Sequence, residues 1–395
     1  MGLVPELPDD RRRRVELDLQ MALGAVYRAT RGTGSSQTEL AYARARALCE
    51  EIGDADRVLE VVYGQFIWAF NRPMLHEAER RAMEFMEIAQ RGQNASALAV
   101  AYQLNGAAAF LLGDLARSRR LLEDCLRLDG ADQALIDLYS HRQYPTFALT
   151  YLAWALFALG YPEQAQARAR EAIAASEGAS AFLYAMALGN GCYLHHFRGD
   201  RAAVEANLEA LLDLAAEKGI VVFHEVARVF QGWTRACRGA VGDGIELMRD
   251  ALERLAATEQ RVEHPYTISL LGETYLWAGR WPEAQEQLDE ALRLVQATDE
   301  RWYEAELNRL AGEVALARGS DVDADMHFHR ALIVARAQSA LMWELRAAKS
   351  LARLWRKTGK VAKARALLAS VLDGFTEGFD TADLIDGRAL LDELA

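Results

Sequence analysis

The sequence is poor in proline and has no excess of positive charge. The first feature argues against a β-rich protein, and the second argues against a protein that binds polyanions. Only 7 of the 395 residues are proline, whereas hydrophobic residues make up 51%. Alanine, leucine, glutamate and arginine fill most windows, which is typical of long helices, so extended β structure is not expected. The formal net charge of −12 argues against a general binder of nucleic acids or anionic membranes, because both require a basic surface.

Cysteine is scarce, and the spacing of the cysteines does not indicate disulfides or a metal site. The four cysteines lie far apart in apolar helical patterns, without a CxxC pair: Cys49, Cys125, Cys192 and Cys237. We expect buried thiols in a reducing compartment instead of disulfides or metal ligands. The N-terminus lacks the apolar core of a signal peptide, and the apolar runs are too short to span a membrane. A soluble cytoplasmic protein is therefore expected.

One glycine recurs with a nearly constant period. The intervals are 39, 40, 40, 40 and 40 residues between Gly160, Gly199, Gly239, Gly279, Gly319 and Gly359. A period of this size indicates stacked supersecondary units. Glycine suits the left-handed conformation that ends a helix, and small residues often follow it by five and twelve positions, on one helical face. Each unit is therefore predicted to be a helical hairpin whose two helices approach closely.

The residues around Gly279 resemble the tetratricopeptide repeat. Those that match are Gly272, Tyr275, Gly279, Ala284, Leu288 and Ala291. The period is about 40 residues instead of about 34, so the helices or loops should be longer. The resemblance implies an all-α, right-handed superhelix of nine hairpins. We expect an N-terminal tail over residues 1–14, a repeat array over 15–375, and a capping helix over 376–395 with Asp380 or Thr381 as its N-cap.

A second resemblance extends over nearly the whole chain. WELRAAKSLARLWRKTGKVAKARALL, which begins at Trp343, and FTEGFDTADLIDGRALLDEL, which begins at Phe375, resemble the end of a bacterial signalling-ATPase (STAND) family. In that family, which includes cyclase-linked and maltose-regulator-like proteins, the repeats bind an effector or a partner. This chain contains no GxxxxGK[ST] phosphate loop, so any output must come from another chain. The position of Met1 fits a stand-alone protein and the repeat part of a longer one equally.

No constellation for catalysis stands out. The pairs His195–His196 and His327/His329 have spacings that point the two rings apart on a helix, so a metal site is not expected. The acidic residues are spread as helical surface charge, and no carboxylate pair is evident. We therefore expect a protein that is not an enzyme and that has no cofactor.

In tetratricopeptide arrays the first helix of each hairpin lines the concave face, through positions 13, 10, 6 and 3 residues before the turn glycine. In the middle repeats these positions are rich in aromatic rings: Phe147, Trp154, Phe157, Tyr193, His196, Trp233 and Tyr266. Such a groove could stack on a sugar, a flat small molecule or the apolar anchors of a peptide. Alternatively, these rings pack between adjacent repeats.

In the last repeat the same positions form a basic stripe: Arg346, Lys349, Arg353 and Arg356. Their spacing puts them on one helical face, where they could clamp a carboxylate or a phosphate-bearing partner. In the preceding repeat, Glu306 and Glu313 occupy the positions equivalent to Arg346 and Arg353, so ion pairs between repeats are the competing explanation.

Two functions are consistent with these patterns. The first is a scaffold in bacterial signalling or regulation, which binds a protein or peptide partner in the concave groove. One form of this hypothesis is that the partner segment is acidic. The second is a small-molecule sensor that regulates an ATPase, a cyclase or a transcription factor. The sensor should require the aromatic residues, whereas a scaffold for acidic segments should require the basic stripe. Neither a membrane nor a nucleic acid is an expected partner.

Overall fold

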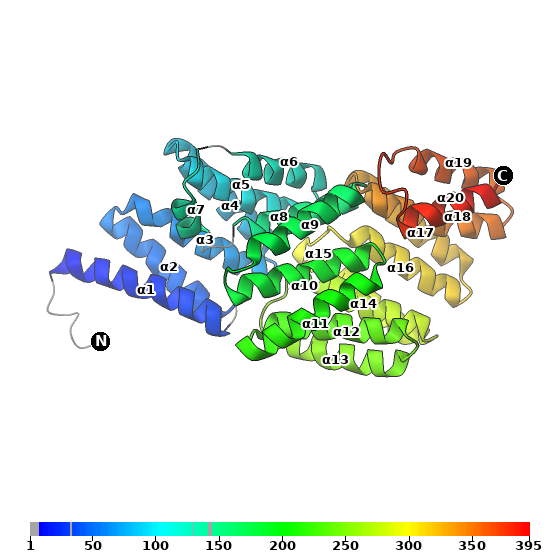
Figure 1. The fold of residues 1–395 in the computed structure, drawn as a ribbon, viewed down its shortest axis with the longest axis horizontal. Helices are drawn as coiled ribbons and strands as arrows, with labels where there is room; N and C mark the ends of the chain where they lie inside the picture. The colour runs from blue at the N-terminus through cyan, green and yellow to red at the C-terminus, as the bar shows by residue number, and fades with distance from the viewer. Residues whose placement is uncertain (1–7, 32–33, 129, 141–143) are drawn as a thin grey trace. The chain divides into compact units, whose positions relative to one another are not determined.

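The computed structural model describes residues 8–31, 34–128, 130–140 and 144–395, which form twenty α helices and no strand (Figure 1). Eighteen of these helices pair into nine consecutive hairpins, as the repeat pattern predicts. In chain order the paired helices are α1 (Asp9–Arg31) and α2 (Ser36–Ile52), α3 (Ala55–Asn71) and α4 (Leu75–Arg91), α5 (Ala95–Leu111) and α6 (Leu115–Arg127), α8 (Thr146–Ala158) and α9 (Pro162–Ser176), α10 (Ala181–Phe197) and α11 (Arg201–Lys218), α12 (Val221–Cys237) and α13 (Val241–Ala256), α14 (His264–Trp277) and α15 (Trp281–Thr298), α16 (Glu304–Ala317) and α17 (Asp321–Ala337), and α18 (Leu341–Lys357) and α19 (Val361–Leu372).

Two helices stand outside the hairpins. The short helix α7 (Gln133–Tyr139) follows α6 and packs on α3. Helix α20 (Ala382–Glu393) packs on α18 and α19, with Thr381 at its N-cap position as predicted, although the Thr381 side chain makes no capping hydrogen bond. Helix α1 begins at Asp9, so helical structure starts before residue 15.

The periodic glycines close the turns between paired helices. The backbone φ angles of all six lie between 68° and 94°, in the left-handed region, which confirms the prediction. At Gly279 the backbone N–H donates to the Leu276 carbonyl at 3.1 Å, which satisfies one of the last carbonyls of α14.

Close approach between paired helices is confirmed at a second glycine position, seven residues before the turn. A Cβ added to Gly312 on α16 would lie 2.5 Å from the ring of Phe328 on α17. A Cβ on Gly106 would lie 2.6 Å from Leu122. These distances are shorter than carbon contacts allow, so a larger side chain would force the two helices apart.

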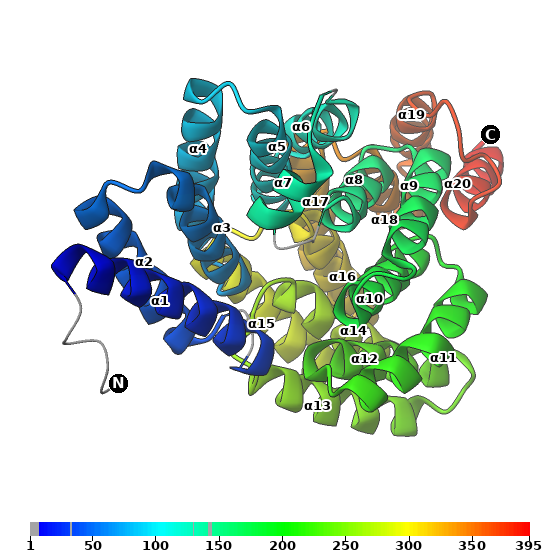
Figure 2. The same cartoon turned by 60° about the vertical axis from the view of Figure 1, so that its left-hand side comes forward.

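The described residues divide into two compact units. Unit 1 comprises residues within 1–108, 121–144 and 255–262, and unit 2 comprises 109–120, 145–254 and 263–395. In unit 1 the Asn71 carbonyl accepts from the N–H groups of Arg261 and Val262, at 2.8 and 3.3 Å. In unit 2 consecutive hairpins pack against each other, and Figure 2 shows α10/α11, α12/α13 and α14/α15 following one another.

Within unit 2 a loop near the C-terminus is fixed to a helix more than 200 residues earlier. The Glu377 carboxylate accepts from the N–H groups of Glu163 and Gln164, at 2.8 and 3.0 Å, at the N-terminal end of α9. In return, the Gly378 N–H donates to the Glu163 carboxylate at 2.9 Å. An anion is favourable at a helix N-terminus, so these bonds hold the loop that leads into α20.

The thiols of Cys49, Cys125 and Cys192 are buried, as predicted, and that of Cys237 is partly buried. Burial raises the pKa of the Cys125 thiol to about 12 and that of Cys237 to about 11. In the described part of the chain, no helix combines the length and the apolar character needed to cross a membrane.

Candidate functional site

A cavity of about 380 Å³ opens in unit 2, and we call it the inner cavity. Its walls come from the first helices of five consecutive hairpins, α10, α12, α14, α16 and α18, together with the start of α20. Nine of its seventeen lining residues stand 13, 10, 6 or 3 residues before a turn glycine. The inner cavity therefore lies at the positions that the repeat spacing assigns to a groove.

Three members of the basic stripe line the inner cavity, and each is held by carboxylates of the protein. Arg346 donates to Glu306 at 3.1 Å and to Asp383 at 2.9 Å. The Lys349 ammonium lies 2.7 Å from Asp383 and 3.0 Å from Asp386. Arg353 lies 2.6 Å from Asp386. Because Asp383 and Asp386 belong to α20, that helix neutralises much of the stripe.

Of the ion pairs of the stripe, those of Arg346 and Lys349 with Asp383 are largely buried, whereas that of Arg353 with Asp386 is exposed. Burial disfavours the charged form of Asp383, but the nearby Arg346 and Lys349 outweigh it and hold the pKa of that carboxyl well below its usual range. The cross-repeat pair expected between Glu306 and Arg346 is present. The equivalent pair of Glu313 with Arg353 does not form, because Glu313 accepts from Ser350 at 2.5 Å and Arg353 turns to α20.

The fourth member of the stripe lies apart from the inner cavity. Arg356 is half-exposed, does not line the cavity, and pairs with Glu393 near the end of α20. Exposed pairs of this kind contribute about 0–1 kcal/mol. The stripe is thus one helical face in the structure, but its members differ in burial.

Two of the aromatic residues that the spacing selected also line the inner cavity. The His196 Nδ1 atom lies 2.8 Å from the Tyr266 hydroxyl, and its Nε2 lies 3.7 Å from the Glu273 carboxylate. Trp233 is 6% exposed, and next to it stands Trp277, which is 46% exposed. Trp277 was not selected by the sequence pattern, because it stands two residues before a turn glycine instead of three.

The other five selected aromatic residues form a buried cluster and do not line the inner cavity: Phe147, Trp154, Phe157, Tyr193 and Tyr266. Trp154 stacks on Tyr193 with ring centroids 4.9 Å apart, and Tyr193 stacks on Tyr266 at 4.8 Å. The Trp154 Nε1 donates to the Asn190 carbonyl at 3.1 Å. Both faces of Tyr193 are thus covered by protein rings.

A pair of carboxyl groups lies beside this cluster, and the sequence analysis missed it. Glu300 is 1% exposed and accepts from the Trp302 indole at 3.1 Å and from the Glu263 backbone N–H at 3.1 Å. The Glu263 carboxylate accepts from the Tyr151 hydroxyl at 2.9 Å. Burial, together with the neighbouring carboxyl, raises the pKa of Glu300 to about 8, and burial raises that of Glu263 to about 7.

The pair had a detectable signal in the sequence. Glu263 and Glu300 each stand three residues before a tyrosine, Tyr266 and Tyr303, in consecutive repeats. Neither carboxyl lines the inner cavity or the outer groove described next. The pair therefore lies outside both concavities, with Glu300 buried and Glu263 partly buried.

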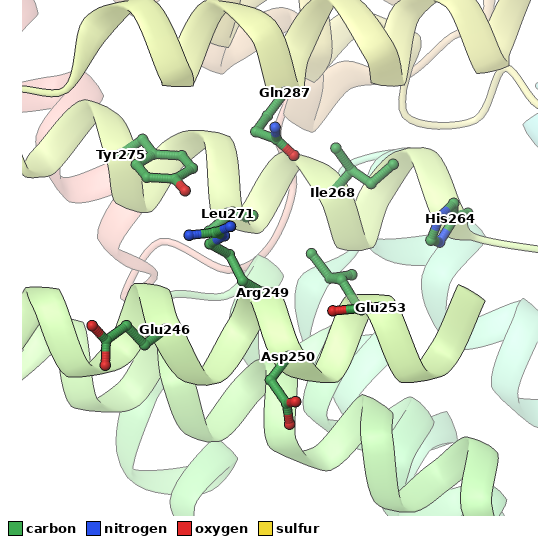
Figure 3. Close-up of a pocket in the computed structure, with 10 residues that line it drawn as sticks. Glu246, Arg249, Asp250, Glu253, His264, Ile268, Leu271, Tyr275 and Gln287 are labelled. Atoms are coloured by element: carbon green, nitrogen blue, oxygen red, sulfur yellow. The ribbon is translucent and has the colours of Figure 1, made fainter. Parts of the chain in front are cut away.

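A second concavity, which we call the outer groove, has a volume of about 550 Å³ and lies among α13, α14 and α15. Figure 3 shows Arg249 extending from α13 toward α14, near Leu271 and Tyr275, whereas the Asp250 carboxylate points away. Asp250 bonds instead to Arg228 of α12 at 2.6 Å. The outer groove thus has a floor of buried side chains such as Leu271 and Tyr275, and charged residues such as Arg249 and Glu253 on its walls.

No protein-family model and no curated protein matches the sequence. Solved structures do resemble its fold. A Rap protein complexed with competence and sporulation factor has a TM-score of 0.60 and 12% identity, over 98% of this chain and 100% of that chain. The APC/C hetero-tetramer Cut9–Hcn1 has a TM-score of 0.51 and 12% identity, over 98% of this chain and 67% of that chain. A STAND protein with a tetratricopeptide repeat sensor, from Pyrococcus horikoshii, has a TM-score of 0.49 and 12% identity, over 98% of this chain and 54% of that chain.

The fold is a tetratricopeptide-like helical repeat. Repeat structures of this kind commonly bind protein or peptide partners. The similarity at 12% identity is a similarity of fold, so the ligand has to be inferred from this chain's own cavity.

Proposed function

We propose that the chain is a non-enzymatic scaffold in bacterial signalling or regulation, which binds a protein or peptide segment in the inner cavity. The observation that carries this proposal is the composition of the cavity wall. Five cationic side chains and five carboxylates line it, along with Trp233, Trp277 and Tyr303. A peptide offers N–H donors, carbonyl acceptors and apolar side chains together, so it can match such a wall.

The packing of the aromatic cluster supports a peptide over a stacked small molecule. Trp154 and Tyr193 are 1% and 2% exposed, and they stack on each other and on further rings. A flat effector would have to displace these contacts before it could stack there. Apolar contact in the inner cavity is instead offered by Trp277, which is 46% exposed.

The ion pairs of the basic stripe bear on the kind of partner. An acidic segment that bound Arg346 and Lys349 would have to displace Asp383, which already contacts both. Breaking a buried pair exposes an uncompensated charge and is costly. A segment with both donors and acceptors can instead bind without removing α20.

The proposal is tested by selecting peptides from a random hexapeptide mixture on the immobilised full chain. Glu273→Lys inverts a charge in the inner cavity, and Glu246→Lys makes the same change in the outer groove. We expect the wild type and Glu246→Lys to retain the same peptides and Glu273→Lys to lose them. Unfolding temperatures of all three proteins verify that they are folded. Loss only with Glu246→Lys, or no retained peptide with any protein, would contradict the proposal.

A further inference from the structure

Helix α17 carries an apolar stripe on its exposed face, and the other second helices do not. The residues 3, 7, 10 and 14 positions after the turn glycine Gly319 are Val322, Met326, His329 and Ile333. We call them the α17 stripe, and its three apolar side chains are 80%, 58% and 60% exposed. After the other five periodic glycines, the same positions hold charged residues, alanine, glycine or proline. The α17 stripe is therefore not required to form a hairpin.

The α17 stripe lies on the side of the helix that no other helix of unit 2 covers. The opposite side of α17 packs on α16 and α18 and carries the buried residues Ala324, Phe328 and Ala331. No residue of α17 lines the inner cavity or the outer groove. Exposed apolar residues that are grouped on one face mark an interaction surface, because their contact with water is unfavourable. The α17 stripe therefore indicates a partner that binds on the side of the second helices.

The spacing of the α17 stripe fits a partner that is itself a helix. The intervals between its four residues are 4, 3 and 4 positions. These are the intervals of the a and d positions of a coiled coil, where the side chains of one helix interlock with the same pattern on another. A second copy of α17 supplies that pattern. The one polar position, His329, suits a surface that also meets water in the single chain.

The charges of α17 fit a second copy that runs in the opposite direction. The N-terminal half of the helix carries three carboxylates and the C-terminal half carries two guanidinium groups: Asp321, Asp323, Asp325, Arg330 and Arg336. Two antiparallel copies place the acidic half of each helix beside the basic half of the other, and their helix dipoles are opposed. Two parallel copies would place the acidic halves together. The charge distribution therefore favours the antiparallel pair.

We propose that the α17 stripe is the contact surface of a homodimer, in which α17 packs antiparallel against α17 of a second copy. The two-fold axis crosses the middle of the stripe, so Val322 of each chain packs beside Ile333 of the other. Asp323 of each chain lies beside Arg330 of the other. This inference concerns the second helices, and it goes beyond the peptide-binding function, which concerns the first helices.

Both charged residues of this contact are open to a partner. Arg330 is 53% exposed although it donates to Glu304 at 3.0 Å, and a guanidinium has further N–H groups to donate. Asp323 is exposed as well. The two can therefore bond across the seam without breaking a buried ion pair.

The size of the contact sets the expected affinity. A helix of 17 residues is about 26 Å long, so one pair of such helices buries less than the about 1,200 Å² at which stable interfaces begin. The dimer is therefore weak, with a dissociation constant on the order of 10 µM.

Sedimentation equilibrium of the full chain tests the homodimer. The mass of the wild type should rise from that of one chain toward that of two between about 1 and 100 µM. Met326→Glu puts a charge into the apolar seam and should weaken association at least about tenfold. Ala206→Glu makes the same charge at the equivalent exposed position of α11 and should keep the wild-type mass curve. Unfolding temperatures verify that both variants are folded.

The charge match is tested by reversing it. Asp323→Lys and Arg330→Glu should each weaken self-association about three- to tenfold, because each puts like charges on the two sides of the seam. An equal mixture of the two variants should associate as tightly as the wild type, since every contact in the mixed dimer then joins opposite charges.

The direction of the helices is tested by disulfide formation under mild oxidation. Val322→Cys and Ile333→Cys should each give no covalent dimer alone, because equal positions lie about 16 Å apart along an antiparallel seam. A mixture of the two variants should give a covalent dimer. The wild type, treated in the same way, controls for the four native cysteines.

Three results would overturn the inference. The mass of one chain at every concentration removes the homodimer and leaves the α17 stripe to a different protein. Equal association of the wild type and Met326→Glu removes α17 as the contact surface. Crosslinking of Val322→Cys with itself, without the mixture, removes the antiparallel order. Each of these results leaves peptide binding in the inner cavity to its own test.

Discussion

Glu300→Gln should flatten the dependence of stability on pH between pH 5 and pH 8. Glu300 is buried, and its pKa is raised to about 8 from an ordinary value of 4.5. A carboxyl whose pKa is raised by folding stabilises the folded state fully below the unfolded pKa. That stabilisation is lost as the pH rises toward the folded pKa. The stability of the wild type should therefore fall through this window.

The size of the effect follows from the pKa values. Taken alone, Glu300 removes about 3 kcal/mol of unfolding free energy when the pH rises from 5 to 8, at about 1.4 kcal/mol per pKa unit. The pKa of the neighbouring Glu263 is raised to about 7, so its ionisation also lowers the stability as the pH rises. Glutamine keeps the size of the side chain and cannot ionise, so the variant should lack the Glu300 part of the loss.

The assay is urea unfolding followed by circular dichroism at pH 5, 6, 7 and 8, for the wild type, Glu300→Gln and Glu286→Gln. Glu286 is exposed on α15 and serves as the matched control. The difference between wild type and Glu300→Gln should change by about 3 kcal/mol across the range, and that between wild type and Glu286→Gln by less than about 0.5. A parallel pH dependence for the wild type and Glu300→Gln would refute the reasoning.

Arg346→Met should lower the unfolding free energy by about 1.5–3 kcal/mol, because Glu306 and Asp383 each lose one of their two cationic partners and keep the other, Arg309 or Lys349. Arg356→Met should lower it by about 0–1 kcal/mol, and equal losses in thermal or urea unfolding would contradict the burial difference. Gly312→Ala should cost about 1–3 kcal/mol, because its Cβ would meet Phe328. Gly242→Ala, where a Cβ has open space, should be neutral or stabilising by up to about 1 kcal/mol, and a cost equal to that of Gly312→Ala would contradict close packing.

The hairpins could be predicted because their signals are local. A turn glycine with positive φ marks seven of the hairpins, and in four of them a second glycine stands seven residues earlier: Gly106, Gly232, Gly272 and Gly312. The extra helix α7 also had a signal that was not used. Gly113 and Gly160 are 47 residues apart instead of about 40, and α7 contains seven residues.

The candidate site could be predicted only in part, because the burial of a side chain depends on which other helices pack over it. The spacing identified the face of each first helix, but the same repeat position holds Tyr193 in the buried cluster and Trp233 in the wall of the inner cavity. Trp302 contacts the cluster from a position outside the pattern. Pairing of the basic stripe with α20 depends on a loop held by Glu377, which no local pattern reveals.

The central claim is that the inner cavity binds a peptide, and photocrosslinking tests it most directly. A random hexapeptide mixture in which every peptide carries one benzophenone is irradiated with the full chain, and the crosslinked residues are identified by mass spectrometry. We predict crosslinks at Trp277 and neighbouring residues of the first helices that line the inner cavity. Crosslinks concentrated in the outer groove, at residues such as Arg249, would contradict the account, as would the absence of crosslinks from the inner cavity.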